Sequence, residues 1–185
     1  KAEPVTEIAQ FFTKKNGQST AKEMYDFLKN TGKLSLVNRK LLELAYRTIA
    51  KINPNLKLRM VNSTTDEGIL APPTVPSSAW YVSKGGQSEA YFLAPGVDNS
   101  NLTAEAVLHE MIHAAVSQII ANPSLKHDAG VLVKELERLR KQAEKFINDN
   151  KLDQHRDAVS SVHELVSWGM TNQAFQDDVL NKISV

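Results

Sequence analysis

The chain has 185 residues, 42% of them hydrophobic, with 22 basic and 21 acidic side chains and a formal charge of +1. This length suits one domain spanning 1–185, and the balanced, intermixed charge predicts neither a nucleic-acid partner nor a membrane partner. Cysteine is absent, which excludes a disulfide scaffold and leaves histidine and carboxylate side chains as ligands for any zinc ion.

The apolar stretches of the sequence are short and interrupted. The longest apolar stretches are interrupted by His, Glu, Ser and Gln, so we predict no signal peptide and no membrane span. We therefore expect a soluble protein. The chain begins with KAEP and not with Met, which favours an excised domain or a processed product of a longer protein.

The N-terminal part, 1–52, is predicted to be helical because apolar residues recur there at intervals of three and four. The helices are expected at 4–14, 19–30 and 34–52, with Asn16-Gly17 and Thr31-Gly32 as breaks.

The metal-binding part, 56–185, is predicted to begin with strands. Residues 56–61 alternate as a half-buried strand does, and a loop rich in Thr, Pro and Ser follows up to Ser78. Aromatic strands at 79–82 and 89–94 surround a hairpin signal at 83–87. The sequence thus predicts a small antiparallel sheet within a mainly helical α+β fold.

Helices are expected for the rest of the chain, at 104–120, 128–150, 157–170 and 171–183. Thr103 can cap the first of them and Asn122-Pro123 can end it. The charges of the second are expected on a solvated face. Its apolar stripe is predicted to contain Val131, Val133, Leu136, Leu139, Ala143 and Phe146.

The helix at 104–120 contains His109-Glu110-Met111-Ile112-His113, the HExxH pattern of zinc hydrolases. Residues i and i+4 lie on one helix face, so His109 and His113 can bind a single ion with Glu110 beside them. The surrounding residues are almost all apolar, which predicts a helix buried on all sides, where an unpaired carboxylate is costly. The alternative is that both histidines form hydrogen bonds within the core and Glu110 pairs with a Lys or Arg.

A catalytic zinc ion normally takes a third protein ligand and leaves one position for water. The downstream candidates are His127, Glu135, Glu137, Glu144, His155, Asp157, His163 and Glu164. The first four are expected to be exposed. Within the segment HRDAVSSVHELVSWGM, helical periodicity does not choose between His163 and Glu164.

AEAVLHEMIHAA followed by SSVHELVSWGMTNQAFQDDVL resembles the zincin-type metallopeptidase domains of bacteriophage proteins and of large polyvalent polyproteins of mobile elements. In those domains a strand hairpin precedes the HExxH helix, and a later HE segment, followed by TN and FQ, supplies a glutamate ligand. The matching residues are His163-Glu164-Leu165-Val166, Thr171-Asn172 and Phe175-Gln176, and the similarity covers about 56–180.

The resemblance implies a gluzincin-type zinc endopeptidase in which His109, His113 and Glu164 hold Zn²⁺ and Glu110 is the general base. It further implies a phage or mobile-element protein acting in the host cytoplasm or virion. The substrate would be a protein or peptide, including the parent polyprotein. The alternative is a catalytically silent, zinc-stabilised structural or interaction module of a virion protein or polyprotein. Glu110 favours the enzyme, because a structural site has no use for a glutamate there.

The aromatic strands are expected beside this site. By the same resemblance, Trp80-Tyr81 and Tyr91-Phe92 would form the upper wall of a cleft along which an extended substrate could add as a strand. Ordinary sheet packing is the alternative for these rings. Tyr91 and His155 are the candidates for donating a hydrogen bond to the oxyanion.

Overall fold

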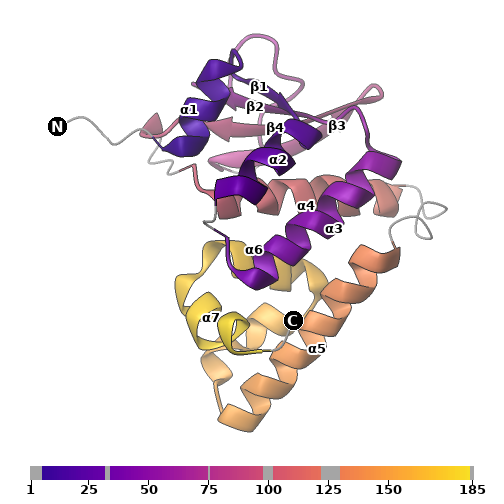
Figure 1. Cartoon of the computed structure of the whole chain (residues 1–185), viewed down its shortest axis with the longest axis vertical. Helices are drawn as coiled ribbons and strands as arrows, with labels where there is room; N and C mark the ends of the chain where they lie inside the picture. The colour runs from indigo at the N-terminus through magenta and orange to yellow at the C-terminus, as the bar shows by residue number, and fades with distance from the viewer. Residues whose placement is uncertain (1–5, 32–33, 75, 98–101, 122–129, 184–185) are drawn as a thin grey trace.

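The computed structural model describes residues 6–31, 34–74, 76–97, 102–121 and 130–183. It has a mixed α+β fold arranged in layers (Figure 1). The sheet lies at one end with α1 (Glu7–Lys14) and α2 (Ala21–Thr31). Helices α3 (Leu36–Ile52) and α4 (Ala104–Ala121) cross the middle, and the later helices form the opposite end.

The sheet of the described chain contains four strands in the order β1-β2-β4-β3. Their bounds are Gln18–Thr20, Lys57–Val61, Ala79–Lys84 and Gln87–Leu93 for β1 to β4. Strand β2 pairs with β4 in parallel, whereas the other pairs are antiparallel, so the prediction of a purely antiparallel sheet is wrong.

The long connection 62–78 explains the parallel pair. It leaves β2 after Val61, which is opposite Leu93, and enters β3 at Ala79, which is opposite Phe92. The connection therefore passes the end of β4 and places β3 at the sheet edge. The chain then returns between β2 and β3. Gly85 and Gly86, with φ of 59° and 79°, make the two-residue turn that confirms the predicted hairpin.

Strand β1 was not predicted, because two of its three residues fall in the helix expected at 19–30. Ser19 pairs with Leu58 across the sheet, and the helix itself begins only at Ala21. Thr20 marks this boundary: its hydroxyl accepts from the Glu23 amide and its own amide donates to the Glu23 carboxylate, both at 3.1 Å. This capping box starts α2 at the point where β1 ends.

Helix α4 begins as predicted, because the Thr103 hydroxyl accepts a hydrogen bond from the Ala106 amide at 3.1 Å. The predicted stop at Asn122-Pro123 lies outside the described residues. Most of α4 is buried against α3, the sheet and α6 (Val162–Thr171). His109 and His113 are only half-buried, so the expectation of a helix enclosed on all sides is wrong. The open side carries the histidines.

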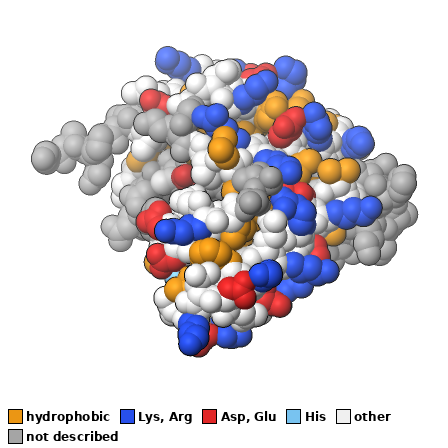
Figure 2. All heavy atoms as spheres, turned by 60° about the horizontal axis from the view of Figure 1, so that its bottom comes forward, with side chains coloured by type: hydrophobic (Ala, Val, Ile, Leu, Met, Phe, Trp, Pro, Cys, Tyr) orange, Lys and Arg blue, Asp and Glu red, His pale blue; other side chains and the backbone are white. Residues whose placement is uncertain are grey.

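Helix α5 (Gly130–Asn150) buries Leu136, Leu139 and Ala143 as predicted, but its buried face differs from the prediction at both ends. Val131 is 68% exposed, while Leu132 and Ile147 are buried. The full buried set is Leu132, Leu136, Leu139, Ala143 and Ile147, a spacing that keeps one face toward the core. The opposite face is charged, as predicted, and Figure 2 shows basic and acidic side chains intermixed over this end of the molecule.

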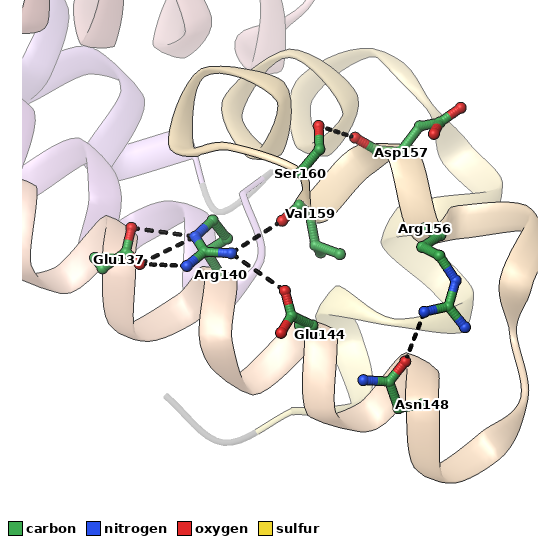
Figure 3. A network of polar contacts seen from close by, with 8 residues as sticks. All are labelled: Glu137, Arg140, Glu144, Asn148, Arg156, Asp157, Val159 and Ser160. Carbon is green, nitrogen blue, oxygen red and sulfur yellow. Dashed lines mark hydrogen bonds and ion pairs between the residues drawn. The ribbon is translucent and has the colours of Figure 1, made fainter.

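The helix predicted for 157–170 is divided. A 3-10 segment, η3 (Asp153–Val159), precedes α6, and Ser161 separates them by accepting a hydrogen bond from the Glu164 amide at 3.1 Å. Arg140 of α5 stabilises this junction, because its guanidinium donates a hydrogen bond to the Val159 carbonyl at 3.1 Å (Figure 3). The local caps and this contact explain the break that apolar periodicity did not reveal.

The final predicted helix, 171–183, is also divided, into α7 (Gln173–Asp178) and η4 (Leu180–Lys182). Asn172 starts α7 by accepting from the Phe175 amide at 2.9 Å. One continuous apolar core includes residues from the N-terminal helices through η4. Among the described helices, none has the length and apolar character needed to cross a lipid bilayer.

Candidate metal centre and adjoining cavity

The two histidines of the HExxH pattern meet on the open side of α4. The Nε2 atoms of His109 and His113 are 2.7 Å apart, and their ring centroids are 4.4 Å apart. A zinc ion at 2.0–2.1 Å from both nitrogens in tetrahedral geometry needs them about 3.3 Å apart. The rings would therefore have to separate by only about 0.6 Å from the observed 2.7 Å to share an ion.

Glu110 lies on the adjoining, buried side of the same helix. Its side chain is 6% exposed, and burial raises the pKa of its carboxyl to about 7. Within the described ranges, Lys and Arg side chains form no ion pair with Glu110, so this half of the alternative is not supported there. The hydrogen bond between the two histidines agrees with its other half. Glu110 is thus a proton-binding group that can exchange its proton near neutral pH.

A cavity of about 260 Å³ adjoins these residues. Residues from α4, strand β3 and the preceding connection line it. They are Glu110, His113 and Ser117 from α4, Ala79, Trp80 and Tyr81 from β3, and Pro73, Thr74 and Ser77 from the connection.

Ser117 was not among the residues singled out from the sequence. It follows His113 by four positions and therefore lies on the same helix face, next to the cavity. Its place could have been inferred by extending the HExxH stripe by one turn. The connection residues Pro73, Thr74 and Ser77 had no comparable signal, because a loop has no periodicity from which to place them.

The structure separates the four predicted wall aromatics. Tyr81 lines the cavity and Phe92 is enclosed in the main core. Trp80 also borders the cavity, but its ring packs on Tyr91 on the sheet face away from α4, with the ring centroids 5.1 Å apart. Tyr81 is held by its hydroxyl, which donates to Ser88 Oγ at 3.1 Å and accepts from Gln118 Nε2 at 3.0 Å. The sheet-packing alternative therefore applies to the rings of Trp80, Tyr91 and Phe92.

Neither candidate for stabilising the oxyanion lines the cavity. The Tyr91 hydroxyl is fully buried and accepts a hydrogen bond from the Leu70 amide at 2.7 Å, and burial raises its pKa. His155 is buried in η3, with Nε2 2.9 Å from Asp178 Oδ2 and its ring 5.8 Å from that of Phe175. Both side chains are therefore packed inside the fold. The sequence could not show this, because periodicity does not say which sheet face or layer a ring reaches.

No described side chain joins His109 and His113 as a third metal ligand. Glu164 is on α6, which packs against α4, and its carboxylate accepts from Trp168 Nε1 at 3.2 Å. Among the described residues, no group of three or more His, Asp or Glu side chains is placed to hold one ion together. The side chain of His163 and the whole of His127 lie outside them. Glu164 therefore stays a prediction.

The glutamates of α5 have other partners. Glu135 pairs with Lys40 at 3.1 Å and with Arg138, and Arg140 pairs with both Glu137 and Glu144. Hydrogen bonds from Arg138 and Arg140 lower the pKa of the Glu135 and Glu137 carboxyls, respectively. The Glu137 and Glu144 side chains, 38% and 51% exposed, belong to the charged face of the helix, as predicted. The Glu135 side chain is only 12% exposed beside Lys40 of α3, so its predicted exposure is wrong.

Comparison with known proteins returns no relative. No protein-family model, no curated protein and no solved structure matches the chain. The functional argument therefore depends on the site itself.

Proposed function

We propose that this protein is a zinc-dependent endopeptidase in which Glu110 is the general base and His109 and His113 are metal ligands. One observation carries the proposal. A buried carboxyl, with a pKa near 7 and no cationic partner among the described residues, lines the same cavity as an imidazole that faces a second imidazole 2.7 Å away. Such a carboxyl weakens the fold when ionised, so its presence is best explained by chemistry.

The residues fit a zinc ion. Two neutral imidazoles are typical zinc ligands, and a carboxylate completes the ligand set of one class of zinc peptidases. We propose Glu164 as this third ligand on the resemblance to the zincin-type domains, and the packing of α6 against α4 agrees with it. When bound, zinc would supply a Lewis acid that acidifies water and polarises a carbonyl.

Glu110 then performs the proton transfers. Its carboxylate accepts the proton of the attacking water and donates it to the nitrogen of the leaving amine, so the side chain ends as it began. Burial makes this carboxyl a stronger base than an exposed glutamate by raising its pKa, which favours the first of these transfers.

Strand β3 can hold the substrate. Its one pairing partner in the described sheet is β4, so its other edge presents backbone N–H and C=O groups beside the cavity. An extended peptide can pair with such an edge. By the resemblance to phage and mobile-element domains, we propose a protein substrate, such as the parent polyprotein, in the host cytoplasm or virion.

A comparison of two Glu→Gln variants on α4 tests the function. Glu110→Gln is expected to keep zinc and to lose at least about 100-fold in hydrolysis of denatured casein or of the parent protein, the usual effect of removing a general base. Glu105→Gln, one turn earlier on the helix, is the matched control and should retain activity. Zinc in the wild type without any chelator-sensitive cleavage would favour the silent structural module instead.

A further inference from the structure

The cavity wall formed by Pro73 and Thr74 belongs to a segment that crosses from one face of the sheet toward α4. We call residues 68–74 the strap. Its first part contacts the sheet face away from α4, where Val61, Trp80, Tyr91 and Leu93 form a small apolar cluster against which Ile69 packs. Its last part reaches the cavity. The strap thus connects the outer cluster with the proposed active site.

Side chains of the sheet fix successive backbone groups of the strap. Arg59 donates to the Gly68 carbonyl at 2.9 Å, and the Leu70 amide donates to the Tyr91 hydroxyl at 2.7 Å. The Trp80 indole then donates to the Ala71 carbonyl at 3.0 Å. Every one of these bonds comes from a side chain on the outer face of β2, β4 or β3.

The anchoring side chains are themselves held in place. The Trp80 and Tyr91 rings pack with their centroids 5.1 Å apart, and the Arg59 guanidinium lies 5.7 Å from the centre of the Tyr91 ring. Arg59 also pairs with Glu89 at 3.2 Å, with side chains only 19% and 10% exposed. The anchors therefore form a connected, largely dry cluster that resists rearrangement.

The last anchor directly precedes the wall. Ala71 is followed by Pro72 and Pro73, whose rings restrict φ to about −65°, so the chain direction set at Ala71 persists to Thr74. A rigid wall adds affinity because it has little conformational freedom to lose when a substrate binds. The hydrogen bond from the Trp80 indole to Ala71 therefore helps to fix the position of the cavity wall at Pro73 and Thr74.

We propose that the strap is the wall that contacts the peptide residues next to the hydrolysed bond, and that Trp80 is the positioning residue which holds this wall in place. This inference rests on the proposed function, since it assigns a peptide to the cavity. It goes beyond that function because it attributes part of the affinity for the peptide to the strap, which side chains on the opposite face of the sheet hold in place.

Two zinc-binding probes of different length separate the wall from the metal centre. Acetohydroxamate contains only the chelating group, whereas trialanine hydroxamate adds a peptide portion that reaches the cavity. With zinc-loaded wild-type protein, calorimetry should show that the tripeptide compound binds more tightly. In Trp80→Phe, which keeps a ring and loses the indole N–H, its affinity should fall about fivefold, the effect of one lost hydrogen bond. Acetohydroxamate should bind within about twofold of wild type.

Amide hydrogen exchange provides a reading that needs no turnover. Trp80→Phe should accelerate exchange in a fragment covering 69–74, and Tyr91→Phe, which removes the acceptor of the Leu70 amide, should do the same. Tyr91→Phe should also weaken the tripeptide compound selectively. The matched control is Tyr46→Phe, because Tyr46 stacks on Tyr25 between α2 and α3, away from the strap.

Faster exchange with unchanged affinity for the tripeptide compound would overturn the inference, and so would an equal loss for both hydroxamates in Trp80→Phe. In the second case Trp80 acts on the metal centre. Failure of the proposed function has a different signature: acetohydroxamate then fails to bind the zinc-loaded wild type, or binds His113→Ala equally well. The inference about the strap falls with it.

Discussion

Glu110 in α4 and Glu137 in α5 are both helical glutamates, but their surroundings differ. Glu137 accepts hydrogen bonds from Arg140, which lower the pKa of its carboxyl, and Arg140 also binds Glu144 and the Val159 carbonyl (Figure 3). Glu110 is buried, with its pKa raised to about 7. Hydrogen bonds from arginine thus stabilise the ionised Glu137 carboxylate, whereas the buried Glu110 carboxyl has no such donor among the described residues.

The largest expected effect concerns the ion beside Glu110. His113→Ala should weaken zinc binding by more than about 100-fold, because loss of a direct ligand exceeds the loss seen when a supporting contact is removed. Elemental analysis of the wild type after mild dialysis should find about one zinc per chain. His155→Ala is the matched control, since His155 pairs with Asp178 and should not affect zinc. Equal zinc content in both variants would remove the metal site.

Glu110 itself should destabilise the metal-free protein at neutral and higher pH. Its folded-state pKa of about 7 lies above its usual value of 4.5, so the folded state binds more protons between these values. The free energy of unfolding therefore falls as pH rises through this range. Glu110→Gln should match wild type near pH 4.5 and exceed it by on the order of 3 kcal/mol at pH 8.

Chemical denaturation at pH 4.5 and pH 8, with chelator present, measures this difference. Glu105→Gln, on the first turn of the same helix, should show the same small change at both pH values. A wild-type advantage over Glu110→Gln at pH 8 would mean that the folded state stabilises the ionised carboxylate, and the contrast with Glu137 would disappear.

The third ligand should give a smaller effect. Glu164→Ala is expected to weaken zinc binding at least about tenfold, whereas His163→Ala should leave it nearly intact, because neighbouring helical residues point about 100° apart. Titration of both variants against a chelator of known affinity makes the comparison. Glu137→Ala serves as the control from the charged face of α5. The reverse order of effects would transfer the ligand role to His163.

The smallest effect is expected where Arg140 of α5 contacts Val159 at the end of η3. Arg140→Met should lower the free energy of unfolding by about 1 kcal/mol, because the Val159 carbonyl loses its donor. Lys145→Met removes only the exposed pair with Asp149, and should change stability less than Arg140→Met does. Urea unfolding of both variants measures the difference. Equal values would show that the contact with Val159 contributes nothing.

Local signals in the sequence determined several of the elements and part of the site. Thr103 and the apolar spacing after it specify α4, and the i,i+4 spacing alone brings His109 and His113 onto one face. Gly85-Gly86 specifies the hairpin, because few other residues adopt positive φ at both turn positions. These features depend on residues within a few positions of each other, which is why they can be read without a fold.

Tertiary structure alone decided the rest. The parallel pairing of β2 with β4 depends on how the connection 62–78 crosses the sheet, and that path also brings Pro73 and Thr74 to the cavity. The assignment of Tyr91 to the outer face depends on strand register, since a shift of one residue would reverse it. The raised pKa of Glu110 likewise follows from burial by distant segments. Such features arise from contacts between residues far apart in the chain, for which the sequence contains no periodic signal.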